Sequence, residues 1–201
     1  MKNACFAAAL LFAAALAPAG ASADVSATSM ASYEQDEAAV DNDTADVRRL
    51  LAQFRAAELP LSRAMTIAEA LHKGSRTARV SFEGSAGYRV RRVRTVMNDV
   101  VWDNTIDATT GRAIGDETVS SLNQLGDQDR SNIKALRSVK QELSDAVAVA
   151  EKAASGKAIG GGLMVDSSKL TFVVVVVSED QLKQVMLEPP RTVREGKPHK
   201  E

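Results

Sequence analysis

Cysteine is nearly missing from this chain. Its 201 residues include a single cysteine, Cys5, which stands at the start of the first apolar run. Removal of the N-terminal residues up to Ala23 as a signal peptide would leave none. Disulfides and a cysteine nucleophile would then be excluded from the mature chain, and its parts would be held together by packing alone.

Histidine is also scarce, which argues against an enzyme or a metal centre. The two histidines are His72, beside Lys73 at the end of an expected helix, and His199 near the C-terminus. A cation is favoured at a helix C-terminus, which explains His72 without catalysis. No H-x-x-x-H or D-x-D-x-D-G spacing occurs, so we expect no enzymatic activity, no metal and no cofactor. Asp103 and Asp107, four residues apart, leave a weak cation site as an alternative to a solvated rim.

Long apolar runs are limited to one, near the N-terminus. Lys2 precedes apolar residues from Ala4 to Ala17, and the small residues A-S-A follow at residues 21–23. A membrane anchor would need about 20 apolar residues. The pattern therefore predicts a secretory signal peptide at residues 1–23 and an exported protein, periplasmic or extracellular, with no membrane span after cleavage.

Basic residues are absent from the next segment. Residues 24–46 carry seven Asp or Glu and no Lys or Arg. With so little apolar surface to bury, this segment is predicted to be a disordered acidic leader. It is either a solvated linker or a segment that folds back on a basic surface of the protein.

Residues 47–114 are predicted to form a first small module with a leading helix. Apolar residues recur at helical spacing from Val47 to Phe54 and again from Leu61 to Leu71, and Gly74 is placed to end the second helix. Alternating polarity then predicts three strands, within residues 78–82, 88–96 and 100–106. The expected fold class is α+β.

Two features interrupt these strands. Arg91 and Arg92 stand together in the second strand and break its alternation, which predicts a β-bulge or an exposed edge. Asn98 and Asp99 predict a hairpin turn. The sequence D-A-T-T-G at residues 107–111 is predicted to be a closing turn, because an Asp side chain can accept from backbone N–H groups two and three residues on and Gly111 can take a positive φ.

The module pattern returns at an offset of 82 residues. Leu61-Ser62-Arg63-Ala64 matches Leu143-Ser144-Asp145-Ala146, and Gly74 matches Gly156. We therefore predict a linker at residues 115–130, with a helical part at 119–125, a second module at 131–194 and a charged tail at 195–201. Each module would pack one helix on a three-stranded antiparallel sheet.

The second module has two distinctive stretches. An apolar stripe predicts one continuous helix from about residue 131 to residue 154. The run F-V-V-V-V-V at residues 172–177 does not alternate in polarity, so we expect it either to be buried on both faces or to be covered by something else. We also expect it to help bury the contact between the modules.

These motifs resemble a known family. A helix with the pattern L-S-x-A-x-x-I-A-E, a glycine, a Tyr-x-Val strand and an ending I-D-A-T-T-G-R resemble the PepSY domain, over residues 61–114 and more weakly over residues 143–193. The resemblance implies a tandem of two cystatin-like modules, the second degenerate because it lacks the closing motif. It also implies a role in inhibiting or regulating peptidases and no enzymatic activity.

A basic cluster is the sequence's candidate for partner binding. Its four residues lie on the second strand: Arg89, Arg91, Arg92 and Arg94. They could meet an acidic partner, or they could be a solvated strand face; nucleic acid is disfavoured by export and by the lack of stacking aromatics. The functional prediction is a secreted or periplasmic binding module that regulates or inhibits a peptidase or another envelope protein. The alternative is an envelope protein that holds an anionic polymer or small ligand through the basic strand.

Overall fold

The structure is a computed structural model that describes residues 45–85, 88–166 and 169–190. The predicted signal peptide, all but two residues of the predicted acidic leader, and the predicted tail lie outside these ranges. Within the described ranges, no helix combines the length and the apolar character needed to cross a membrane.

The described residues form four α-helices and one short 3₁₀-helix. The leading helix covers residues 45–55, as predicted. It is followed by α2 (Leu61–Leu71), the 3₁₀-helix η1 (Leu122–Gln124), α3 (Asp127–Leu136) and α4 (Leu143–Ala154). Helix α2 starts directly after Pro60, buries one stripe of small and apolar side chains, and is followed by Gly74 at a φ of 92°.

The continuous helix predicted from about residue 131 to residue 154 is wrong. Helix α3 stops at Leu136 and α4 starts at Leu143. Arg76 stabilises the break: its Nε lies 2.9 Å from both carboxylate oxygens of Glu142. Its terminal nitrogens donate to three carbonyl oxygens of the break, those of Leu136, Val139 and Gln141. Carbonyl groups that a helix would have used internally are thus bound by one guanidinium.

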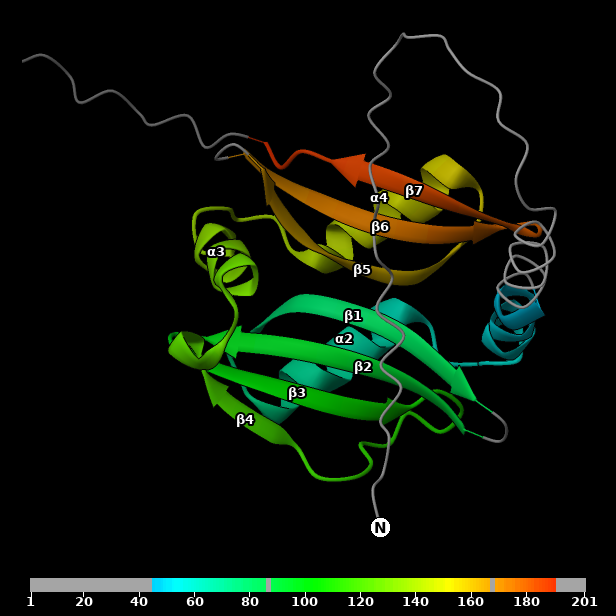
Figure 1. Ribbon diagram of the computed structural model, residues 1–201, viewed down its shortest axis with the longest axis horizontal. Helices are drawn as coiled ribbons and strands as arrows, with labels where there is room; N and C mark the ends of the chain where they lie inside the picture. Colours follow the sequence, from blue (N-terminus) through cyan, green and yellow to red (C-terminus); the bar gives the residue numbers. More distant parts are fainter. Residues whose placement is uncertain (1–44, 86–87, 167–168, 191–201) are drawn as a thin grey trace, which may run out of the picture. The chain divides into compact units, whose positions relative to one another are not determined.

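The strands form one sheet. They are β1 (Arg76–Ser85), β2 (Tyr88–Met97), β3 (Val100–Asp107), β4 (Thr118–Ser121), β5 (Lys157–Asp166), β6 (Lys169–Ser178) and β7 (Gln181–Leu187). Their order across the seven-stranded sheet is β4-β3-β2-β1-β5-β6-β7, and every neighbouring pair is antiparallel (Figure 1). The predicted α+β class is confirmed.

The two halves are more closely joined than separate modules would be. The junction is made by backbone pairing of β1 with β5, in which Val80 lies opposite Gly161. A side chain on Gly160 would come within 3.3 Å of the Val80 carbonyl oxygen, so the glycines suit this close approach. Strand β4 and η1 come from residues expected to form a linker with a helical part, so the first half has four strands.

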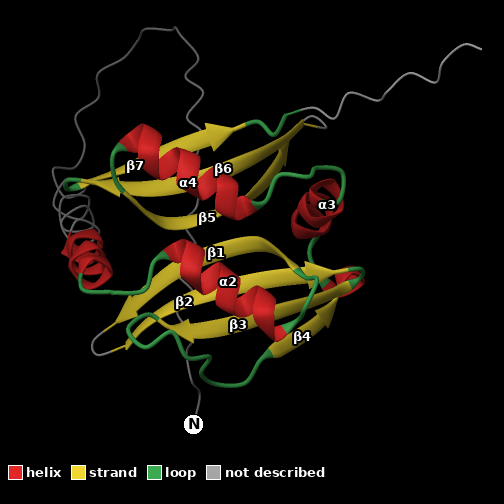
Figure 2. Cartoon of the chain, turned by 180° about the vertical axis from the view of Figure 1, so that it is seen from behind, coloured by secondary structure: helices red, strands yellow, loops and turns green. Residues whose placement is uncertain are grey.

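Both halves repeat the order of one helix and three long strands, and α2 and α4 cover the same side of the sheet (Figure 2). A shared contact supports the predicted offset. Glu69 of α2 accepts from the backbone N–H of Thr77 at 2.9 Å. Glu151 of α4, 82 residues later, accepts from the backbone N–H of Ala158 at 2.9 Å. In each half a helix glutamate thus binds the beginning of the first strand.

The sequence D-A-T-T-G forms the predicted closing turn. Asp107 Oδ1 accepts from the backbone N–H groups of Thr109 and Thr110, at 3.0 and 2.6 Å, and from the Thr110 hydroxyl at 2.9 Å. Gly111 takes a φ of 72°. The bonds from Thr110, followed by that from Thr109, lower the pKa of Asp107.

The side chains of the valine run at residues 172–177 are buried to different extents on the two faces of β6. Phe172, Val174 and Val176 are fully buried in the main core, which the two helices cover. Val173 and Val175 are only half-buried, so the prediction of burial on both faces is wrong for them. The run does help to join the halves, because Val177 packs with Phe54 and Phe82 in a smaller core under the leading helix.

Candidate functional site

The four arginines predicted to bind a partner are divided between the two faces of the sheet. Side chains alternate along a strand, so Arg89 and Arg91 share the face of the buried Val93, and Arg92 and Arg94 share the other. The predicted bulge or exposed edge at this point is wrong. No bulge occurs at Arg91 and Arg92, because the pairing of β2 with β1 is regular there and its register shift falls between Thr77 and Arg79. No edge is exposed there either, because β2 lies between β1 and β3.

Arg92 and Arg94 are already bound to carboxylates. Arg92 Nε lies 2.6 Å from Glu83 Oε2. Arg94 contacts both oxygens of Asp103, at 2.8 and 3.0 Å, and its Nη1 lies 2.6 Å from Asp129 of α3. The hydrogen bond with Glu83 raises the pKa of Arg92, and that with Asp103 raises the pKa of Arg94. Their charge is therefore largely matched within the protein.

Arg89 and Arg91 instead hold the segment between the leading helix and α2. Arg89 Nη1 donates to the Ala56 carbonyl at 2.9 Å. Arg91 donates to the Leu59 carbonyl from Nη2 at 2.8 Å and from Nε at 3.3 Å. Its Cζ lies 5.2 Å from the centre of the Phe54 ring and 4.9 Å from that of Phe82, and only 2% of Arg91 is exposed.

Arg91 is thus a buried cation to which no carboxylate of the described residues is hydrogen-bonded. Burial lowers its pKa to about 10, while the charge of Glu151 acts in the opposite direction. The side chain stays protonated at neutral pH. Its Nη1 has no hydrogen-bond acceptor among the described residues. A buried charged donor without a partner is costly, and it marks Arg91 as a candidate functional group.

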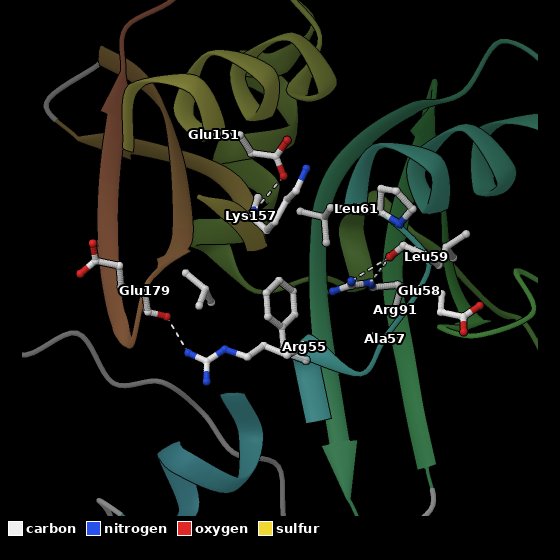
Figure 3. A pocket seen from close by; sticks show the side chains of 13 residues that line it. Arg55, Ala57, Glu58, Leu59, Leu61, Arg91, Glu151, Lys157 and Glu179 are labelled. Atoms are coloured by element: carbon white, nitrogen blue, oxygen red, sulfur yellow. Dashed lines mark hydrogen bonds between the residues drawn. The ribbon is translucent and has the colours of Figure 1, made fainter. Parts of the chain in front are cut away.

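A cleft of about 340 Å³ adjoins Arg91 (Figure 3). It lies where five parts of the structure meet: the leading helix, the start of α2, the end of α4, the start of β5 and the end of β6. Apolar walls come from Phe54, Leu61 and Val177, and Lys157 and Glu151 line the same cleft. The cleft was not predicted from the sequence; the signal for it is the pair of arginines in β2, Arg91 and Arg92.

The face of the sheet opposite α2 and α4 differs between the halves. In the first half it carries charged residues, among them Arg79, Glu83, Arg92, Arg94 and Asp103. In the second half Val173 pairs with Met186 and Val177 with Leu182. Leu182 is 42% exposed and Met186 is 53% exposed. The exposed apolar side chains of this face in the second half therefore include Leu182 and Met186 of β7, beside the half-buried Val173 of β6.

Strand β7 is an edge of the sheet, and no described strand pairs with its outer side. A two-residue loop joins it to β6, with Ser178 opposite Gln181. Such a loop is closed by a hydrogen-bonded pair, and bonded and non-bonded pairs then alternate. The backbone groups of Leu182, Gln184 and Met186 consequently point away from β6. This edge was not predicted from the sequence.

A smaller pocket lies at the other end of α2. His72 stacks on Trp102 with ring centres 4.1 Å apart, and its Nε2 lies 2.6 Å from Glu117 Oε1. These contacts give His72 a structural role at the helix end. Asp103 and Asp107 are occupied by Arg94 and by the closing turn. The described residues contain no group of three or more His, Cys, Asp or Glu suited to a metal ion.

Comparison with known proteins assigns part of the chain. No curated protein matches it. A solved structure from Clostridium difficile 630, described as a "putative lipoprotein", is similar over 66% of this chain and 87% of its own, with 15% identity and a TM-score of 0.40. Residues 58–117 match the family model "Peptidase propeptide and YPEB domain". The chain therefore carries a PepSY domain from the residues before α2 to the residue before β4.

Proposed function

We propose that the chain is an exported, non-enzymatic binding module that regulates or inhibits a peptidase or another envelope protein. The PepSY domain at residues 58–117 supports this class of function, because the family description refers to peptidase propeptides. We also propose that the second half is a degenerate PepSY copy. The repeated element order and the matching contacts of Glu69 and Glu151 support the duplication.

The observation that carries the proposal is the outer edge of β7. A long exposed edge with apolar side chains is a hazard unless a partner covers it. We assign that role to an extended segment of the partner protein, which adds to the sheet beside β7. The backbone groups of Leu182, Gln184 and Met186 supply its hydrogen bonds. Apolar side chains of the segment rest on Leu182 and Met186, beside the half-buried Val173.

The alternative, an anionic polymer held by the basic strand, has less support. Arg91 is buried, and the ion pairs of Arg92 and Arg94 use their charge inside the protein. A polymer would have to compete with carboxylates that are already in place. The edge of β7 has no such competitor among the described residues.

The test compares two substitutions at one position. Gln184→Pro removes an outward N–H group without removing a bond to β6, whereas Gln184→Ala keeps the N–H group and serves as the matched control. Residues 24–201 of each variant are assayed for inhibition of a thermolysin-like peptidase and for capture of envelope proteins. Equal circular dichroism spectra and unfolding midpoints show that both variants are folded.

We expect Gln184→Ala to behave like the unchanged protein and Gln184→Pro to raise the inhibition constant at least about tenfold, a loss of about 1.4 kcal/mol. If the peptidase is not inhibited, the same tenfold contrast is expected for the envelope protein that is captured. Equal binding by the two variants would refute the assignment of the edge. An absence of any protein partner would refute the proposed function.

A further inference from the structure

Within the described part of the chain, no carboxylate is hydrogen-bonded to the charge of Arg91. Its Nε and Nη2 share one neutral acceptor, the carbonyl oxygen of Leu59. Burial lowers the pKa of Arg91 and the charge of Glu151 raises it, but Glu151 Oε1 accepts from the backbone N–H of Ala158, at 2.9 Å. Nη1 is left as a buried donor without an acceptor among the described residues. Nη1 therefore needs one hydrogen-bond acceptor, and an anion would be the strongest one.

The adjoining cleft can hold more than a bare anion. Its volume of about 340 Å³ corresponds to the share of roughly ten water molecules in the liquid. Phe54, Leu61 and Val177 give it apolar walls, which suit a hydrocarbon chain. Lys157 also lines the cleft and has no ion-pair partner among the described residues.

The charges of the lining favour a single negative charge on the ligand. Besides Arg91 and Lys157, the lining contains Arg55, which is bound to Asp180 and to the Glu179 carbonyl. It also contains three carboxylates: Glu58, Glu151 and Glu179. These would repel a phosphate dianion more than a monoanion. A planar carboxylate also matches the geometry of a guanidinium edge.

From these observations we infer that the cleft binds a monocarboxylate with an apolar chain, with the carboxylate on Arg91 Nη1 and near Lys157. Nη1 is buried, and the ring of Phe54 lies against the guanidinium. The carboxylate therefore reaches Nη1 by shifting Phe54, which belongs to the leading helix.

The C-terminal residue of a peptide and a free alkanoic acid share this chemistry. The inference does not rest on the proposed function, because it uses no part of the β7 edge.

The test is a titration of residues 24–201 followed by NMR of backbone amides and arginine side chains. The probes are N-acetyl-alanyl-leucine, which presents a peptide carboxylate, hexanoate, which presents an alkanoic acid, and the C-terminal amide of the dipeptide as a neutral control. We expect saturable shifts at Arg91 and around Leu59 with one or both acids, and at least tenfold weaker binding of the amide. The acid that binds better identifies the source.

Two lysine variants locate the site without disturbing the buried arginine. Lys157→Gln removes a charge from the lining and is expected to weaken binding at least threefold. Lys152→Gln removes an exposed charge of α4 outside the lining and is expected to change nothing.

Arg91→Lys keeps the charge but shortens the donor, and we expect it to abolish binding if it folds. Equal binding of acid and amide, shifts away from Arg91, or no saturation by either acid up to roughly 10 mM would overturn the inference.

Discussion

The two halves of this sheet have the same order of elements but different open faces. In the first half the face opposite the helices carries arginines and carboxylates that bind one another, as in the contacts of Arg94 with Asp103 and Asp129. In the second half the corresponding face carries Val173, Leu182 and Met186. A repeated topology therefore does not repeat its surface. The charged face, which attracts attention in the sequence, is the face on which Arg92 and Arg94 already bind carboxylates.

This difference changes where a partner is expected. Exposed or half-exposed ion pairs contribute little stability, and a partner that displaces them must replace their contacts. A partner that covers exposed apolar side chains at an edge removes them from water, which favours binding.

The first prediction concerns the two faces of β6. Phe172→Ala should lower the free energy of unfolding by about 3–5 kcal/mol, because the ring is fully buried under α4. Val173→Ala, on the half-exposed face, should cost about 1 kcal/mol or less. Urea unfolding at equilibrium measures both. Similar losses at the two positions would show that the open face is covered in solution, and the contrast between the halves would disappear.

The second prediction concerns neighbouring arginines of β2. Arg91→Ala should lower the free energy of unfolding by about 2–4 kcal/mol, since it leaves the Leu59 carbonyl without its donor and opens a space between two rings. Arg92→Ala removes an exposed ion pair with Glu83 and should cost less than about 1 kcal/mol. The same unfolding assay applies. A larger loss at Arg92 than at Arg91 would contradict the assignment of the two faces.

The third prediction concerns the closing turn of the first half, at residues 107–111. The folded state lowers the pKa of Asp107 below its ordinary value of 3.8, mainly through hydrogen bonds from Thr110. The ionised carboxylate therefore adds stability above that value and loses it as the pH falls through the folded pKa. Asp107→Asn should cost about 1 kcal/mol or less near neutral pH, because the turn is at the surface.

The pH dependence supplies the control for this third prediction. The difference between Asp107→Asn and the unchanged protein should shrink as the pH is lowered below about 4, where the wild-type carboxyl takes up its proton. A difference that grows on acidification would mean that the carboxylate is not stabilised by the turn. Unfolding curves at a series of pH values decide between these outcomes.

Much of the fold could be predicted from the sequence because local patterns determine it. Helix α2 follows from apolar spacing after Pro60, and the turn at Asp107 follows from side-chain chemistry that acts within three residues. The hairpin at Asn98 and Asp99 joins Met97 to Val100, as predicted. In each case the contacts that decide the structure lie close together in the chain.

The errors and omissions share a different cause. The break between α3 and α4 depends on Arg76, about 60 residues away in the chain. Arg91 breaks the alternation of polar and apolar residues in β2 because Phe54 of the leading helix covers it. Strand β4 forms because it can pair with the edge of β3. The candidate cleft and the edge of β7 likewise arise only when the two halves share one sheet. Contacts over such sequence distances leave little local pattern to recognise: for the cleft, it is the broken alternation at Arg91 and Arg92.

The most direct test of the account is hydrogen–deuterium exchange of residues 24–201 alone and in complex with the peptidase or envelope protein that they bind. We expect strong new protection of residues 181–187, where the backbone groups of Leu182, Gln184 and Met186 point outward, and little change at residues 89–94 of β2. Protection that appears on β2 and leaves β7 unchanged would contradict the central claim that the apolar half, and not the charged half, makes the contact.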